Sequence, residues 1–210
     1  MFSLLTRQTA AAVRLLVVFT ILLGIVYPLA VWGISRIPGL AGPAEGSIIT
    51  SADGTSIGSG VGSSLIGVDP VAADSAADPF FHTRPSASAE DVLGPGDTST
   101  SGGSNKSGFN TDLLDAVNQR RALIAAREDV DPALVPPDAV TASASGLDPH
   151  ISPEYAQIQV ARVARVTGLP VAEVQSLVAG VTDRRVLGFL GEPTVNVTEL
   201  NLAVAAAAQR

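Results

Sequence analysis

Residues 15–35 read LLVVFTILLGIVYPLAVWGIS, and this stretch decides the architecture of the chain. It contains 21 consecutive residues without a charge, bounded by Arg14 and Arg36. A helix over it, rising about 1.5 Å per residue, is roughly 31 Å long, which matches the hydrocarbon core of a bilayer. The pattern therefore predicts a transmembrane helix near the N-terminus.

Three residues of this stretch distinguish a membrane span from a cleaved signal peptide. A signal peptide has an apolar core of about 7–15 residues that ends at small residues. Here the core is longer, and Tyr27, Pro28 and Trp32 stand where small residues are expected. Aromatic side chains favour the membrane interface, and a span tolerates the kink or loosening expected at Pro28. We expect the helix to stay uncleaved.

The basic residues around the span set its expected orientation. Arg7 and Arg14 precede it without any acidic residue, whereas Arg36 alone follows it closely. The positive-inside rule then places residues 1–14 in the cytoplasm and residues 37–210 outside. The sequence thus predicts a single-pass protein of the cell membrane, in contact with lipid.

Composition excludes several classes of function. The chain has 210 residues and a net charge of −7, and residues 37–210 hold 20 acidic against 10 basic residues, a net −10. Such a charge opposes binding to nucleic acid phosphates. There is no cysteine, which excludes disulfides, cysteine-ligated metals and a cysteine nucleophile. With two histidines, a three-histidine metal site is impossible, and we expect no resident metal.

The remainder has the pattern of an α+β domain. Residues 37–68 combine short β-branched stretches with many glycines, which predicts a small sheet with tight turns. Residues 69–110 are rich in small residues and form a long loop, which Phe80 and Phe81 are expected to pin to the core.

Helices are expected in the C-terminal half. Ser152 is a predicted N-cap with Pro153 at the first helical position, and Asn196 with Glu199 has the spacing of a capping box. The predicted helices cover 112–127, 153–166, a short stretch between Pro170 and Gly180, and 197–208. We expect Arg120, Arg121 and Arg127 to be solvated, and 185–190 to form a strand or a buried turn.

One glycine-rich stretch is a candidate anion site. Ser101, Gly102, Gly103, Ser104 and Asn105 are small enough to present backbone amides as a nest, or to form a simple tight turn. A Walker A loop is not present, because Lys106-Ser107 follows Asn105 where that motif has a glycine. Autonomous nucleotide binding is therefore not expected.

A second candidate lies just before the helix over 153–166. Asp148, His150 and Glu154 gather two carboxylates and an imidazole within seven residues. Acid–base chemistry by a membrane-anchored exported hydrolase, or a binding role, is one interpretation; turn and cap roles are the other. Ser143 and Ser145 lack the G-x-S-x-G pattern of a hydrolase nucleophile.

Taken together, the chain resembles the C subunit of the Kdp high-affinity potassium-transporting ATPase. Five stretches in order carry this resemblance after one span, and 141–153 (TASASGLDPHISP) is the most specific. The others are Arg84–Ala87, Ser101–Asn105, Leu187–Pro193 and Val195–Leu202. Departures from the family pattern are Val68 for a usual glutamine, Phe80 for a usual tyrosine, and Lys106 for an apolar residue.

The resemblance implies a non-catalytic accessory subunit. Its implied partners are a channel-like potassium-translocating subunit, a P-type ATPase subunit and a small single-span subunit. It also implies a catalytic chaperone that raises the ATP affinity of the ATPase subunit, with ATP bound only within the complex. Direct nucleotide binding by Ser101–Asn105 is a separate hypothesis, which rests on the nest itself. Because ATP is hydrolysed in the cytoplasm, an outer domain cannot touch it, and assembly or covering the outer potassium entrance fits the expected topology better.

Overall fold

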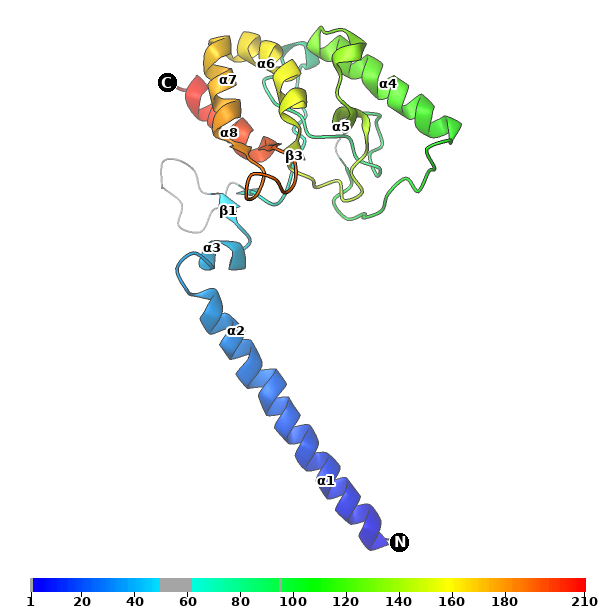
Figure 1. Ribbon diagram of the computed structural model, residues 1–210, viewed down its shortest axis with the longest axis vertical. Coiled ribbons are helices and arrows are strands. Elements are labelled where there is room, and N and C mark those ends of the chain that lie inside the picture. Colours follow the sequence, from blue (N-terminus) through cyan, green and yellow to red (C-terminus); the bar gives the residue numbers. More distant parts are fainter. Residues whose placement is uncertain (1, 50–61, 95) are drawn as a thin grey trace. The chain divides into compact units, whose positions relative to one another are not determined.

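The computed structural model describes residues 2–49, 62–94 and 96–210 (Figure 1). The chain divides into two compact units, Met1–Ser47 and Ile48–Arg210. The first is helical and the second is a mixed helix and small-sheet domain, so the α+β prediction holds for the second unit.

The first unit contains a long apolar helix. It comprises α1 (Phe2–Ile21), the π-helical segment η1 (Leu22–Val26) and α2 (Tyr27–Ser35). Within Leu5–Ser35 the most apolar 18-residue window has a mean hydropathy of 2.5, and among the described residues this is the one helix long and apolar enough to cross a membrane. The helix extends further toward the N-terminus than residues 15–35, because residues 2–14 contain no glycine or proline to end it.

Pro28 explains the change of helix type. Proline has no N–H and its ring clashes with the carbonyl four residues earlier, here that of Gly24. The helix widens there: the Tyr27 N–H donates to the carbonyl of Leu22, five residues back. The predicted loosening at Pro28 is confirmed. A four-residue helix, α3 (Ala41–Ala44), follows where strand and turn were expected.

The second unit is built around four helices. They are α4 (Thr111–Glu128), α6 (Pro153–Thr167), α7 (Val171–Gly180) and α8 (Val197–Ala208). Helix α6 packs against α4 and α7, and α7 also packs against α8 (Figure 1). Short elements complete it: η2 (Ser75–Ala77), η3 (Pro132–Leu134) and α5 (Pro137–Val140).

The helix boundaries follow from their caps. The side chain of Ser152 accepts a hydrogen bond from the Tyr155 N–H, and that of Asn196 accepts from the Glu199 N–H. Gly168 ends α6 in the left-handed region, with φ of +76°. All four predicted helices are confirmed. Their inner faces supply most of the core, which includes Ile124, Val163, Val174 and Leu200.

The strands are short. They are β1 (Ile48–Ile49), β2 (Gly62–Ser63), β3 (His150–Ile151), β4 (Thr182–Asp183) and β5 (Thr194–Asn196). β1 pairs with β2, and β5 lies between β3 and β4, all antiparallel. Residues 50–61 of the predicted first sheet lie outside the described residues.

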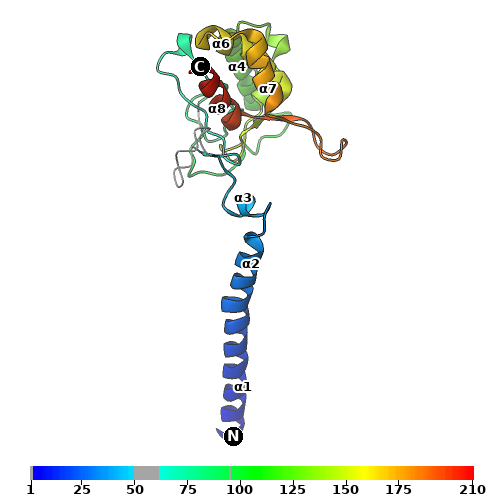
Figure 2. The same ribbon diagram turned by 90° about the vertical axis from the view of Figure 1, so that its left-hand side faces the viewer.

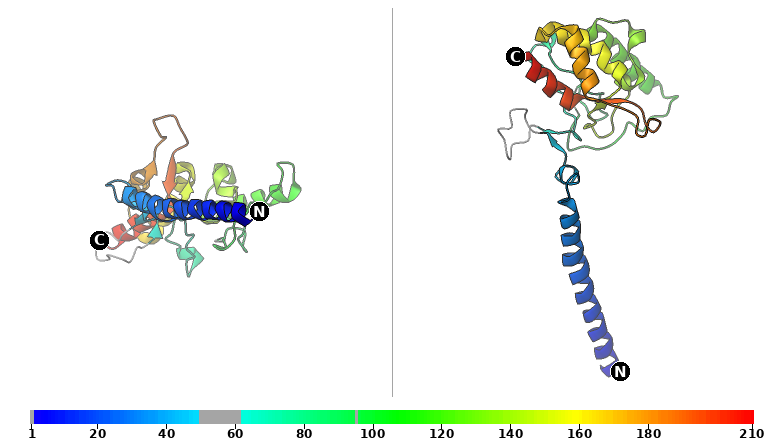
Figure 3. Two further views of the ribbon diagram at one scale, coloured as in Figure 1. Left: turned by 90° about the horizontal axis from the view of Figure 1, so that it is seen from below. Right: turned by 60° about the vertical axis from the view of Figure 1, so that its left-hand side comes forward.

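Two predictions about loops have opposite outcomes. Phe81 is fully buried, so it pins the long loop as expected, and among the described residues of that loop η2 is the only helix. Residues 185–190, expected to be a strand or buried turn, instead form an exposed hairpin between β4 and β5. It projects from the helical layer in Figures 2 and 3.

Candidate functional site

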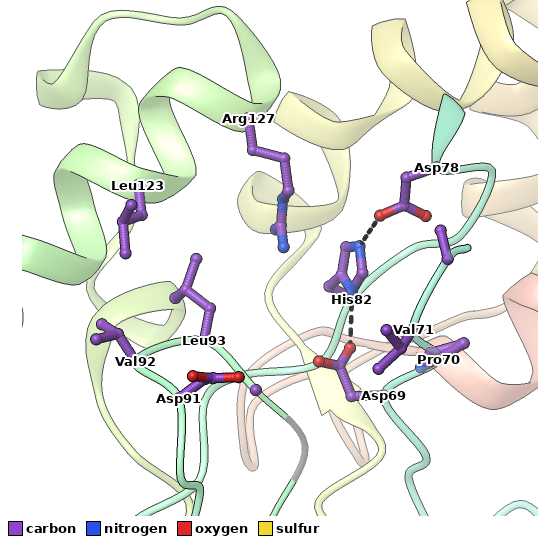
Figure 4. Close-up of a pocket in the computed structure, with 12 residues that line it drawn as sticks. Asp69, Pro70, Val71, Asp78, His82, Asp91, Val92, Leu93, Leu123 and Arg127 are labelled. Atoms are coloured by element: carbon purple, nitrogen blue, oxygen red, sulfur yellow. Dashed lines mark hydrogen bonds and ion pairs between the residues drawn. The ribbon is translucent and has the colours of Figure 1, made fainter. Parts of the chain in front are cut away.

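A histidine between two carboxylates forms the centre of a buried polar cluster in the second unit. The Nδ1 atom of His82 lies 2.9 Å from Asp69 Oδ1, and its Nε2 atom lies 2.5 Å from Asp78 Oδ2 (Figure 4). His82 is 7% exposed and Asp78 is 5% exposed. Both ring nitrogens face acceptors, an arrangement that only the doubly protonated imidazolium satisfies completely.

Two side-chain amides hold the backbone of this segment. Gln159 on α6 accepts from the His82 N–H at 2.8 Å and donates to the His82 carbonyl at 3.3 Å. Asn201 on α8 does the same for Phe81, at 2.7 and 2.9 Å. The two amides satisfy the backbone groups that a neighbouring strand would otherwise pair, so the loop is buried without joining a sheet.

A buried ion pair reinforces the same segment from α6. Arg162, 3% exposed, places Nε 2.9 Å from Oε2 of Glu128, the last residue of α4. Its Nη1 atom donates to the carbonyls of Asp78 and Phe80 at 2.8 and 2.9 Å. One guanidinium therefore links α4, α6 and the loop.

Arg127 completes the cluster and corrects a prediction. It donates to Glu128 at 2.6 Å and to the hydroxyl of buried Tyr155 at 3.1 Å, whereas the sequence predicted a solvated side chain. Arg120, also expected in solvent, donates to the carbonyls of Val92 and Val140. Each long side chain lies inward because its guanidinium finds a hydrogen-bond acceptor inside the domain. Helix periodicity does not reveal such acceptors.

The charges of the cluster balance only when His82 carries a proton. Three carboxylates (Asp69, Asp78 and Glu128) face two guanidiniums (Arg127 and Arg162), and the imidazolium supplies the third positive charge. Burial opposes that charge, but the hydrogen bonds to Asp69 and Asp78 outweigh it, and the pKa of His82 is raised above 6.5.

The pKa of Asp78 moves in the complementary direction. Burial alone would raise it, but the hydrogen bonds from His82 and the Phe80 N–H, with the charges of His82 and Arg162, hold the pKa of Asp78 below 3.8. Among the described residues, every buried side-chain nitrogen and oxygen has a partner. The cluster is thus a closed network that binds a proton and fixes the loop.

An open pocket of about 430 Å³ borders the cluster. Asp69, Asp78, His82 and Arg127 line it, together with apolar residues such as Leu93 (Figure 4). The polar groups turn toward one another rather than toward the open space, because each already has a partner within the protein. The polar side chains of the cluster therefore offer little to a ligand, and Asp91 is a further carboxylate that lines the pocket.

The predicted nest, Ser101–Asn105, lies elsewhere on the surface. All five residues are exposed, and Asn105 has a positive φ of 53°. The Gly102 N–H already donates to the carbonyl of Ala144 at 2.8 Å, and Lys106 pairs with Asp112 at 3.3 Å. The stretch is irregular, without a helix, strand or hydrogen-bonded turn, and it docks on the segment at Ala144. Its nucleotide contact stays a prediction.

The second candidate, around Asp148 and His150, has the arrangement of a turn. Asp148 accepts from the His150 N–H at 3.0 Å and from Arg84 at 3.2 Å. His150 Nδ1 lies 3.8 Å from Asp148 Oδ1, beyond hydrogen-bond range, and Ser143 Oγ is bonded to Ser145 Oγ. The base–carboxylate contact that a hydrolase triad needs is not formed here.

The segment that begins at Thr141 contacts segments that lie far from it in the chain. Arg84 donates to the carbonyls of Thr141 and Ala142, and the Ser143 N–H donates to the Pro85 carbonyl at 2.7 Å. The segment also meets the chain before the long loop, because the Gly67 N–H donates to the Leu147 carbonyl at 2.7 Å. A Cβ at Gly67 would come within 2.5 Å of the Asp148 carbonyl oxygen, so only glycine fits.

Sequence reasoning missed the His82 cluster. Its members come from positions 69 to 162. Asp78 and His82 are four residues apart, but they lie in a loop where that spacing fixes no geometry, and Arg162 meets Glu128 across 34 residues. One signal was available: Gln159 and Arg162 lie on α6, three residues apart, on the face that also carries the apolar Tyr155 and Val163. Polar residues on an apolar helix face need buried partners, and that is what the loop provides.

Comparison with known proteins gives the family. A family model described as "KdpC: K+-transporting ATPase, c chain" matches residues 9–206, nearly the whole chain. The chain belongs to this KdpC family. The match includes the apolar helix and the α+β domain alike, and it confirms the resemblance read from the five stretches.

Curated relatives cover the same length. A "Potassium-transporting ATPase KdpC subunit" of Kineococcus radiotolerans is 48% identical over 97% of this chain and 96% of that protein. Proteins of the same name from Beijerinckia indica and Geobacter sulfurreducens are 43% and 42% identical, over 90% and 94% of this chain and 88% and 97% of their own. This chain is an accessory KdpC subunit of the potassium-transporting ATPase, with one N-terminal helix suited to span the membrane.

Proposed function

We propose that this subunit acts from outside the cell membrane as a non-catalytic assembly factor of the potassium pump. Its partners are the channel-like potassium-translocating subunit, the P-type ATPase subunit and the small single-span subunit. The observation that carries the proposal is the distribution of charge around the apolar helix. Arg7 and Arg14 precede it, and the domain that follows carries a net −10.

The orientation limits how the subunit affects ATP hydrolysis. A domain outside the membrane does not contact cytoplasmic ATP. Any rise in ATP affinity of the ATPase subunit, the chaperone effect, then arises indirectly, because binding of this subunit favours one conformation of the complex over another. The domain itself is suited to stabilise assembly and to cover the outer entrance for potassium.

Two observations support a binding role over a hydrolytic one. The carboxylates and the imidazole of the His82 cluster already form hydrogen bonds with one another. The Asp148–His150 pair lacks the contact that would orient a general base. Within the described residues, the buried polar side chains of the domain are paired internally, which suits docking better than acid–base chemistry.

The absence of cysteine allows a clean test of topology. Single substitutions Thr9→Cys and Val171→Cys, at exposed positions of the two units, introduce the only thiols. We expect a membrane-impermeant maleimide to label residue 171 in intact cells, and residue 9 only after permeabilisation. Labelling of residue 9 from outside would reverse the orientation.

Assembly is tested by purification through a tag on this subunit from cells that also express the other pump subunits. We expect the potassium-translocating and ATPase subunits to co-purify. A chain that stays alone beside its expressed partners would overturn the assembly role.

A further inference from the structure

The hairpin between β4 and β5 exposes an apolar surface that the domain itself does not cover. Val186 is 66% exposed, Leu187 80%, Phe189 66% and Leu190 49%. They lie on consecutive positions around Gly188, and Figures 2 and 3 show the hairpin projecting away from the helices. Such large side chains at the tip of a projection contribute nothing to the core of their own domain.

The tip has a fixed shape. The Val186 and Leu190 backbones exchange hydrogen bonds of 2.9 and 3.0 Å, and the Phe189 N–H donates to the Val186 carbonyl at 3.3 Å. Leu187 and Gly188 both have positive φ, 55° and 81°, as the central residues of type I′ turns do. At the neck, Arg185 forms an ion pair with Glu192.

Leu187 is an unfavourable choice for this turn. The left-handed region suits glycine and asparagine, whereas a residue with an apolar side chain is strained there. Exposure adds to the cost, since a leucine at the surface leaves apolar area in water. A strained, exposed leucine is explained if its side chain is buried by something outside the domain.

We propose that this hairpin inserts its apolar tip into an apolar recess on the outer surface of a membrane-embedded subunit of the same pump, an inference that rests on the assembly role proposed above. The four side chains expose on the order of 400 Å² of apolar surface, within the range of the largest patches on monomers, which are often binding sites. That is about half of what one partner contributes to a stable interface. The tip therefore suits a partner already held nearby, which a subunit in the same membrane is.

The charges around the tip favour a protein recess over the lipid surface. Asp183 and Glu192 offset Arg184 and Arg185 at the neck, so the hairpin has no excess positive charge for anionic headgroups. The net −10 of residues 37–210 opposes such headgroups as well. A fluid bilayer also requires no particular shape, whereas the fixed turn at Leu187 and Gly188 suits a recess of fixed shape.

Photo-crosslinking in the whole pump tests the contact directly. A benzophenone amino acid replaces Phe189 in the tagged full chain, and the same replacement at Leu134, which is 61% exposed outside the hairpin, is the matched control. We expect irradiation to join position 189, and not position 134, to another pump subunit. Attachment to lipid alone, or equal crosslinking from both positions, would overturn the proposal.

Two substitutions test how much the hairpin tip contributes to the stability of the complex. Leu187→Asn and Phe189→Ser remove apolar side chains, and Leu134→Ser is the control at a separate exposed site. We expect each hairpin variant to lower recovery of the complex roughly tenfold or more, as truncation of a central apolar anchor does. Undiminished recovery with both variants would sink the hairpin proposal, whereas failure of the wild-type chain to co-purify would instead sink the assembly role.

Discussion

The interior around Arg162 and the surface around Leu187 invert the usual placement of side chains. Arg162 and Glu128 are charged and 3% and 4% exposed, whereas Leu187 is apolar and 80% exposed. Inside, each charge has a partner within hydrogen-bond reach. At the surface, the Leu187 side chain is not buried by any apolar neighbour in the described part of its own domain. The difference shows that a side chain is buried when its own chain supplies matching partners, which are hydrogen-bonding groups for a charge and apolar surface for a leucine. The exposed apolar tip therefore points to an apolar surface on another molecule.

The largest expected effect comes from breaking the interior network at Arg162. The substitution Arg162→Met leaves Glu128 buried beside Arg127 alone and orphans the carbonyls of Asp78 and Phe80. We expect the free energy of unfolding to fall by about 3–5 kcal/mol. Urea unfolding of the full chain in detergent micelles, followed by circular dichroism, measures it.

Arg165 supplies the matched control for that measurement. It lies one turn along the same helix and is exposed. We expect Arg165→Met to change the free energy of unfolding by less than about 0.5 kcal/mol. Equal losses at both positions would show that helix α6 as a whole, and not the buried pair, sets the stability.

A smaller effect is expected from pH, through His82. Because the pKa of His82 is raised on folding, its contribution to stability is complete below the unfolded value of 6.5 and is lost as pH rises through the folded value. Asp78, whose pKa is lowered, contributes above 3.8 and loses its contribution as pH falls through its folded value. Both contributions are complete only between these limits.

The measurement compares variants across that range. We expect the wild-type free energy of unfolding to fall as pH rises from 6.5 through the folded pKa of His82, and His82→Gln to remove much of this fall. His150→Gln, at the other histidine, should keep it. If His82→Gln retained the full pH dependence, a group outside the cluster would be responsible.

The smallest expected effect, and the one of opposite sign, is in the hairpin. Leu187→Asn replaces a strained residue with one that adopts positive φ readily and removes no buried contact. We expect the free energy of unfolding of the chain without its partners to rise by a few tenths of a kcal/mol, up to about 1. The same urea denaturation measures this change. Leu190→Asn, at an exposed hairpin position without a positive φ, is the control. A loss of stability at residue 187 would mean that the leucine serves its own domain.

Much of the secondary structure was predictable because its signals are local. Ser152 and Asn196 cap the helices that begin after them, and Gly168 ends one, since caps act within a single turn. Pro28 loosened the helix at the expected point because its missing N–H acts four residues away. Residues 185–190 were misjudged, because an apolar run has the same local pattern whether it is buried or exposed.

The sequence by itself determined the apolar helix, the four helices of the domain and membership of the KdpC family, since each depends on residues close together or in order along the chain. Only the tertiary structure decided the environments of Arg127 and His82, and the exposure of Leu187. The physical reason is that the free energy of a charged or apolar side chain depends on what surrounds it. Many of those surroundings come from residues tens of positions away, such as Tyr155 beside Arg127 and Gln159 beside His82.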